Sequence, residues 1–130
     1  MKSIAICGSS RFKPEIKEWT QRLEDLGVTV YPPYLVGNPD QDGWKNLNEE
    51  QKKFVALGLT HDHFYKIQMA DVVFIYNKDG YAGNSTTLEI GYSVAMGKPI
   101  YALTEDGEIC RHVLFREFIS SPEELVKRLQ

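Results

Sequence analysis

Short apolar runs alternate along the chain with stretches in which apolar residues recur every three or four positions. The runs are continuous, as in Ile-Ala-Ile-Cys at 4–7 and Val-Val-Phe-Ile-Tyr at 72–76, as expected for strands buried on both faces of a parallel sheet. Ile16, Trp19 and Leu23 have the spacing of an amphipathic helix. The pattern predicts strands at residues 4–7, 28–31, 71–76, 100–103 and 117–119, and helices at 14–26, 48–57, 61–69, 87–96, 108–114 and from 122 onward.

This order of strands and helices predicts an α/β fold. We expect a doubly wound, flavodoxin- or Rossmann-like sheet of five parallel strands in the order 2-1-3-4-5, with helices on both faces. The length of 130 residues fits a single domain spanning 1–130. In such a sheet, ligands bind beyond the carboxyl ends of the strands where the strand order reverses. The turns at 8–11 and 77–85 should therefore flank one crevice.

Local signals suggest where the helices around that crevice begin and end. Asn48, followed by two acids, indicates an N-cap, and Gly58 is expected to end that helix so that Thr60 caps the next one. Thr86-Thr87-Leu88-Glu89 fits a capping box, in which Glu89 is the third helical residue. Residues 35–45 show no periodicity and predict a long loop that acts as a lid or a partner-binding flap. Trp44 in this loop is placed either over a ligand or in a dimer interface.

Charge and composition narrow the range of partners. The chain carries 15 Lys and Arg and 18 Asp and Glu without a basic block, which argues against nucleic acid as a partner. No apolar run approaches the length of a membrane span and no signal-peptide core is present, so we expect a cytoplasmic protein without membrane contact. Neither a GxGxxG nor a P-loop motif occurs, and we expect no cofactor.

The cysteines and histidines match no metal-ligand or disulfide spacing. Cys7 lies in an apolar strand and is expected to be a small core residue, whereas Cys110 is isolated. His61 and His63 are two residues apart on a predicted helix and point to different sides, and His112 is alone. The sequence therefore predicts no metal site.

The strongest functional signal lies at residues 80–99, where a Gly-rich turn follows the third strand and opens a helix that carries Glu89. Gly80 and Gly83 allow a ligand to approach the backbone closely, and a helix N-terminus favours an anion. Tyr92 adds a polar group one turn beyond Glu89. The pattern leaves two roles open for Glu89, a helix cap or a catalytic group.

The motifs resemble those of the nucleoside 2-deoxyribosyltransferase family, which includes the deoxynucleoside monophosphate N-glycosidases. The similar segments are Gly-Ser-x-Arg at 8–11, Ala-Asp-Val-Val at 70–73, Leu-Glu-Ile-Gly-Tyr at 88–92 and Gly-Lys-Pro at 97–99. The resemblance implies the doubly wound fold, a small-molecule nucleoside or nucleotide as substrate, and Glu89 as the nucleophile on C1′ of deoxyribose. The nucleobase then leaves, and another base or water takes over the glycosyl group.

Two departures from the family pattern concern the remaining site residues. The family carries an aspartate that protonates the leaving base, and the matching position in this chain is His63, with Asp62 adjacent. Either residue is therefore a candidate for the acid. The alternative is that both residues belong to the first turn of a helix, where Asp62 complements the helix dipole. A polar residue that holds the sugar 5′ end is replaced by Gly83. We expect catalytic roles for Glu89, Asp62 and His63, and substrate contacts from Gly8, Ser9, Arg11, Asn77, Gly83, Asn84, Ser85 and Tyr92, with Ser9 and Arg11 on a 5′-phosphate.

Two other functions remain open at this stage. One is a phosphoribohydrolase that releases a base from a nucleoside monophosphate, and the other is a nucleotide-binding module without catalysis. The resemblance also implies a homodimer or higher homo-oligomer, in which Tyr92, Met96 and Trp44 are expected near the interface. The sequence leaves the base, the sugar, the acceptor, and the choice between transfer and hydrolysis undecided.

Overall fold

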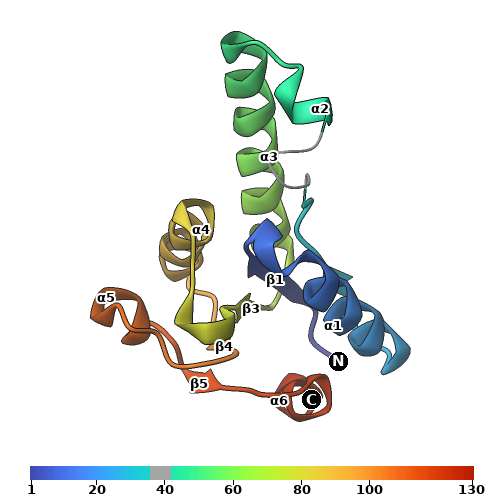
Figure 1. Cartoon of the computed structure of the whole chain (residues 1–130). Coiled ribbons are helices and arrows are strands. Elements are labelled where there is room, and N and C mark those ends of the chain that lie inside the picture. Colours follow the sequence, from blue (N-terminus) through green and yellow to red (C-terminus); the bar gives the residue numbers. More distant parts are fainter. Residues whose placement is uncertain (36–41) are drawn as a thin grey trace.

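The computed structural model describes residues 1–35 and 42–130 (Figure 1). The strands are β1 (Ile4–Gly8), β2 (Val30–Tyr31), β3 (Val72–Tyr76), β4 (Ile100–Ala102) and β5 (Glu117–Phe118). The helices are α1 (Lys13–Asp25), α2 (Asp42–Lys45), α3 (Glu49–Met69), α4 (Asn84–Ala95), α5 (Ile109–His112) and α6 (Pro122–Leu129), with short 3-10 turns at Ser10–Phe12 and Lys78–Gly80. Most observed ends lie within one or two residues of the predicted ones.

The strands form one five-stranded sheet in the order β2-β1-β3-β4-β5, and every pair is parallel. The predicted fold class and strand order are therefore confirmed. Gly8 at the end of β1 lies opposite Tyr76 at the end of β3, so the loops that follow these two strands leave the same edge of the sheet. This is the edge at which the chain reverses its strand order and at which ligands bind in doubly wound folds.

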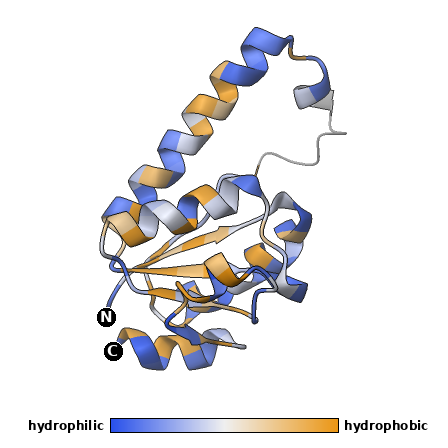
Figure 2. Cartoon of the chain, turned by 90° about the vertical axis from the view of Figure 1, so that its left-hand side faces the viewer, coloured by the Kyte–Doolittle hydropathy of each residue, from blue (hydrophilic) through white to orange (hydrophobic). Residues whose placement is uncertain are grey.

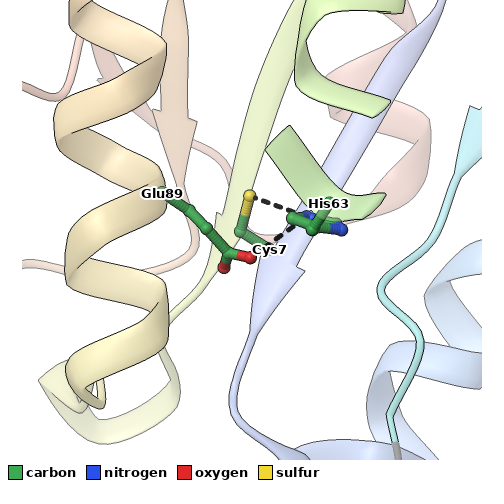
Figure 3. A group of neighbouring side chains, drawn as sticks. All are labelled: Cys7, His63 and Glu89. Atoms are coloured by element: carbon green, nitrogen blue, oxygen red, sulfur yellow. Dashed lines mark hydrogen bonds and ion pairs between the residues drawn. The ribbon is translucent and has the colours of Figure 1, made fainter. Parts of the chain in front are cut away.

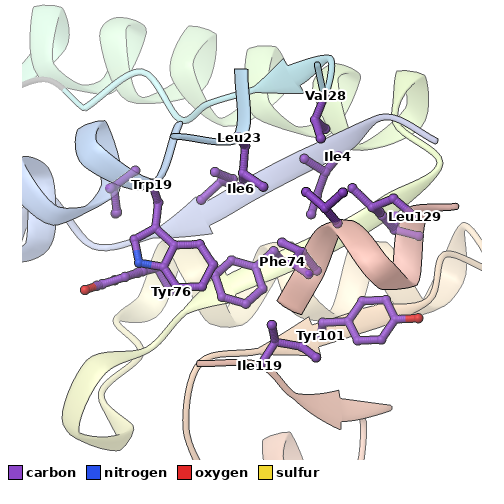
Figure 4. Packing of buried hydrophobic residues seen from close by; sticks show 14 of the residues in the cluster. Ile4, Ile6, Trp19, Leu23, Val28, Phe74, Tyr76, Tyr101, Ile119 and Leu129 are labelled. Atoms are coloured by element: carbon purple, nitrogen blue, oxygen red, sulfur yellow. The ribbon is translucent and has the colours of Figure 1, made fainter. Parts of the chain in front are cut away.

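Successive side chains of each strand enter two different hydrophobic layers, which explains why the apolar runs are continuous. On one face, Ile4 and Ile6 pack with Phe74 against α1 and α6, where Trp19 stacks on Phe74 with ring centroids 4.6 Å apart (Figure 4). On the other face, Ala5 and Cys7 pack toward α3 and α4. Cys7 is thus a buried residue, as predicted, and its layer is the one that carries Glu89 and His63.

The predicted helix break at Gly58 is wrong. The helix α3 runs without interruption from Glu49 to Met69, and the Thr60 hydroxyl donates to the Ala56 carbonyl within it instead of capping a new helix. One glycine costs a helix roughly 1 kcal/mol, whereas ending and restarting a helix leaves several backbone groups to be satisfied. The predicted cap at Asn48 is correct, since Asn48 and Gln51 form a reciprocal capping box.

The uninterrupted α3 projects beyond the sheet (Figures 1 and 2). Its first half rises away from the sheet, with α2 beside its upper end in Figure 1, and Phe54 on it is 79% exposed. Its second half packs on the sheet through Ile67. The predicted loop at 35–45 is replaced in part by α2, which contains Trp44, while residues 36–41 of that prediction lie outside the described residues. None of the helices in 1–35 and 42–130 combines the length and hydropathy needed to cross a membrane.

The predicted capping box at Thr86 is also wrong. The helix α4 begins at Asn84, and its N-cap is Gly83, whose carbonyl accepts from the Thr87 amide at 3.0 Å and the Thr87 hydroxyl at 2.9 Å. Asn84, Ser85 and Thr86 all belong to residue types that cap helices, so the local pattern did not distinguish the start. Glu89 therefore lies in the second turn of α4, too far along the helix to cap its N-terminus.

Candidate active site

A pocket of about 400 Å³ opens at the sheet edge where β1 and β3 end. Its walls come from α3, α4, and the segments that follow β1 and β2. This volume is in the usual range for small-molecule sites, roughly 300–1,000 Å³. The residues that line it are Ser10, Pro33, Tyr34, Leu35, Trp44, Ala56, Leu59, Thr60, His63, Ser85 and Glu89.

Three side chains from three different elements meet at one place (Figure 3), and two of them, His63 and Glu89, line the pocket. Cys7 comes from β1, His63 from α3 and Glu89 from α4. The Cys7 Sγ lies 3.2 Å from His63 Nε2, and His63 Nε2 lies 3.7 Å from Glu89 Oε2. The side chains of His63 and Glu89 are only 5% and 12% exposed. The sheet edge thus brings together a thiol, an imidazole and a carboxyl group away from bulk water.

Burial sets the protonation of this cluster. It raises the pKa of Glu89 to about 8, and the positive charge of Lys66 opposes this only in part. Burial lowers the pKa of His63 to about 4, and Lys66 acts in the same direction while Asp62 opposes it. Burial, and then the charge of Glu89, raises the pKa of the Cys7 thiol well above its usual value. At neutral pH the empty site therefore holds a carboxylic acid, a neutral imidazole and a thiol.

Of the three expected catalytic residues, Glu89 and His63 reach the pocket and Asp62 does not line it. Asp62 is half exposed and forms an ion pair with Lys66, at 3.0 Å, one turn further along α3. Asp62 and His63 lie in the middle of α3, so the alternative of a first helical turn does not apply to them. His63 Nδ1 is buried without a hydrogen-bond partner among the described residues.

Of the eight expected substrate contacts, Ser85 lines the pocket and the other seven do not. Two of these seven, Asn77 and Tyr92, bond to other parts of the chain. The Asn77 amide is buried, donates to the Thr104 carbonyl at 2.9 Å and accepts from the Thr104 amide at 3.0 Å, which ties the ends of β3 and β4 together. The Tyr92 ring stacks on Phe64 with centroids 4.4 Å apart, and its hydroxyl accepts from Gln68. The two contacts of Tyr92 hold α4 against α3.

The expected residues after β1 lie next to the pocket residue Ser10 in the sequence. The Ser9 side chain accepts from the Arg11 amide at 3.2 Å, and the Arg11 guanidinium lies 3.7 Å above the centre of the Tyr81 ring. Gly8 allows this turn to pack closely, since a Cβ there would lie 3.2 Å from the Tyr76 carbonyl oxygen. Ser10, between Ser9 and Arg11, lines the pocket itself.

After β3, the expected residues Gly83, Asn84 and Ser85 form the start of α4. Ser85 lines the pocket, and Asn84 is an exposed first helical residue. The expected homo-oligomer stays a prediction. Of its three expected interface residues, Met96 is 43% exposed, whereas Trp44 lines the pocket.

Sequence reasoning missed several residues in or next to the pocket. Cys7 is a core residue, as predicted, but its contact with His63 was not predicted, although its position next to the end of β1, at the reversal of strand order, was a usable signal. Tyr34 and Leu35 follow β2 in a stretch without periodicity, and Leu59 and Thr60 belong to the part of α3 where a break was expected. Their proximity to Glu89 depends on the long uninterrupted α3.

Comparison with known proteins agrees with this fold. A sequence model described as nucleoside 2-deoxyribosyltransferase matches residues 4–119. The chain belongs to the nucleoside 2-deoxyribosyltransferase family. Among curated protein sequences, none matches the chain.

Solved structures similar to this family member share its fold at low sequence identity. A 2-deoxyribosyltransferase from Bacillus psychrosaccharolyticus is 21% identical, with a TM-score of 0.65 over 95% of this chain and 90% of that one. A conserved protein from Enterococcus faecalis V583 is 16% identical, with a TM-score of 0.63 over 99% and 97%. A CMP N-glycosidase from Clostridium botulinum is 18% identical, with a TM-score of 0.52 over 98% of both chains.

Proposed function

We propose that this member of the nucleoside 2-deoxyribosyltransferase family cleaves the N-glycosidic bond of a deoxynucleoside or its 5′-monophosphate, with Glu89 as the nucleophile. The position of Glu89 carries the proposal. It is a nearly buried carboxyl group at the base of a small-molecule pocket, and it lies too far along α4 to serve as a helix cap. Cleavage of this bond builds positive charge at C1′, which a carboxylate stabilises or traps as a glycosyl ester.

The pair of His63 and Glu89 supplies the proton that the reaction needs. In the empty pocket the proton belongs to Glu89, because burial raises the pKa of Glu89 and lowers that of His63. A substrate whose C1′ gains positive charge favours the ionised carboxylate, and His63 Nε2, 3.7 Å from Glu89, is the nearest base to receive the proton. The transfer creates the nucleophile and the acid together without changing the net charge of the pocket.

The chemical steps then balance within this pair. Glu89 attacks C1′, the bond from C1′ to the base nitrogen breaks, and the imidazolium of His63 gives its proton to the departing base. Water or a second base next attacks C1′, His63 accepts the proton of that acceptor, and Glu89 is released as a carboxylate. With His63 as the acid, the pair contains both groups that the reaction needs.

The direct test is formation of free base. Purified protein is incubated with each deoxynucleoside and each 5′-monophosphate, and the free base is measured by chromatography. The proposal predicts base release with at least one of these substrates. A binding module would instead show ligand-induced thermal stabilisation without base release. Addition of a second base to the same reaction separates transfer from hydrolysis.

The apolar half of the pocket is suited to the nucleobase. Its lining includes Pro33, Tyr34 and Trp44. Stacking of one base on an aromatic side chain is worth about 1–3 kcal/mol. We expect Trp44→Ala to weaken substrate binding roughly ten- to a hundredfold, measured as KM or by thermal stabilisation, with kcat changed by only a fewfold.

The control for this variant is Tyr65→Ala, which removes a 60% exposed aromatic residue from a part of α3 outside the pocket lining. It should bind substrate as the native protein does. Native binding by Trp44→Ala would mean that the base occupies another part of the pocket.

We propose that Arg11 binds the 5′-phosphate of a monophosphate substrate. It is exposed at the end of β1, beside the pocket residue Ser10, and Tyr81 supports its guanidinium. A charge-assisted hydrogen bond contributes about 1.5–3 kcal/mol, so Arg11→Ala should weaken monophosphate binding roughly ten- to a hundredfold and leave nucleoside binding unchanged. Arg116→Ala, at an exposed arginine before β5, is the matched control. Equal affinity of the native protein for both ligand types would contradict this role.

A further inference from the structure

The cluster of Cys7, His63 and Glu89 has the geometry of a metal site as well as that of a catalytic pair. Its three donor atoms lie within 4.8 Å of one another, and two of the separations are 3.2 Å and 3.7 Å. Tetrahedral zinc with bonds of about 2.3 Å to sulfur and about 2.0–2.2 Å to nitrogen and oxygen requires donor separations of roughly 3.3–3.6 Å. The two measured separations therefore differ from a zinc geometry by only a few tenths of an ångström.

We propose that Cys7, His63 and Glu89 bind a zinc ion, with the fourth coordination position open to the pocket. A thiolate, an imidazole and a carboxylate are the ligand types that zinc accepts together, whereas magnesium and calcium require oxygen ligands. The three residues come from β1, α3 and α4, which pack on one face of the sheet, so the donors are held in place before the ion arrives. His63 and Glu89 also line the pocket, which gives the ion an entry path.

Charge balance favours a divalent ion in this buried place. Zinc binds a thiolate and a carboxylate as anions and an imidazole as a neutral ligand. The two anionic ligands neutralise the two positive charges of the ion. A monovalent cation would offer no such balance.

Zinc binding has a consequence for catalysis, and this part rests on the proposed function. A carboxylate that ligates zinc is not available to attack C1′, and the ion occupies the space beside it. Zinc should therefore inhibit base release reversibly, and a chelator should restore it. The sequence offered no sign of this site, because Cys7 and His63 are 56 positions apart and no short spacing connects the ligands.

The binding test needs no catalytic activity. The whole chain is freed of metal with a chelator and titrated with cobalt(II), a spectroscopic substitute for zinc, and then with zinc. We expect one equivalent of cobalt to give the near-ultraviolet absorption of a thiolate-to-cobalt bond, zinc to displace it, and zinc to raise the melting temperature. Cys7→Ser should abolish the thiolate band, and His63→Gln and Glu89→Gln should each weaken zinc binding by about a hundredfold.

Two matched variants control for other ligands. Cys110→Ser removes the exposed cysteine, and His61→Gln removes an exposed histidine two residues from His63; both should bind as the native protein does. The proposal is overturned if cobalt gives no thiolate band, if the band survives in Cys7→Ser, or if it is lost in Cys110→Ser. Glu89→Gln gives an independent result should Cys7→Ser fail to fold. Zinc binding by a protein that releases no base when it is free of metal would keep this site and reject the proposed function. Base release by the metal-free protein without any zinc binding would keep the proposed function and reject this site.

Discussion

Glu89→Gln is expected to lower base release by a factor on the order of a thousand or more, because it removes the only proposed nucleophile. The substitution should otherwise leave folding and substrate binding nearly unchanged. Burial raises the pKa of Glu89 to about 8, so at neutral pH the native side chain is already uncharged, and the amide has nearly the same size. Stability should therefore change by less than about 1.5 kcal/mol. Binding of the substrate should remain within a fewfold of native.

The control is Glu105→Gln, which makes the same chemical change at an exposed glutamate after β4. Its turnover and stability should both equal those of the native protein. Turnover by Glu89→Gln within a fewfold of native would refute the catalytic role of Glu89. A large loss of stability together with loss of turnover would point instead to a packing role, which is why melting temperature is measured alongside kcat.

His63→Gln should have the second largest effect, a loss of roughly a hundred- to ten-thousandfold in kcat/KM, the range for removal of a general acid. The loss should depend on the leaving group. A deoxynucleoside of 7-methylguanine carries a cationic base that departs without protonation, so its cleavage should be far less sensitive to the variant. A merely structural role for His63 would lower the cleavage of both substrates equally.

Two neighbours on α3 serve as controls for His63. His61→Gln removes an exposed imidazole, and Asp62→Asn breaks an ion pair with Lys66 that lies outside the pocket lining. Both variants should retain turnover within a fewfold of native. A loss in Asp62→Asn that exceeds the loss in His63→Gln would assign the acid to Asp62 instead.

The pH profile of the metal-free protein checks the same pair. With the pKa of His63 at about 4 and that of Glu89 at about 8, the pair holds a single proton between these values. Above about pH 8 the proton is lost and no acid remains for the leaving base, so kcat/KM should fall. Below about pH 4 a second proton is bound and the nucleophile is lost. The 7-methylguanine substrate should lack the fall on the alkaline side.

The fold could be predicted because its signal is repeated along the chain. Each apolar run that forms β1, β3 or β4 carries the pattern of a strand covered on both faces, and the helical spacings fall between them. The ends of α4 and α3 could not be predicted equally well. All four residues at 83–86 are compatible with an N-cap, so the start of α4 was ambiguous. The prediction of a break at Gly58 was wrong because one glycine destabilises a helix less than ending and restarting the helix does.

The site could be predicted only in part for a different reason. Glu89 was predicted from its local motif, and His63 from the position at which the similar family carries its acid. Their contact with Cys7 depends on how β1, α3 and α4 pack, and no local pattern encodes that packing. Asn77 was expected to bind substrate from its place at a strand end, and the local pattern did not predict the hydrogen bonds of its amide to Thr104, which tie the ends of β3 and β4 together.

The central claim is tested most directly by trapping the glycosyl-enzyme. The protein is mixed with a deoxynucleoside that carries fluorine at C2′ of the sugar and a good leaving group at C1′. The fluorine slows both steps, and the good leaving group restores the first, so that the glycosyl-enzyme forms faster than it is broken down. The protein is then denatured, digested and analysed by mass spectrometry. The account predicts that the peptide containing Glu89 gains the mass of the sugar, and that Glu89→Gln forms no such adduct. Release of base from the native protein with the sugar attached to another residue would contradict the account.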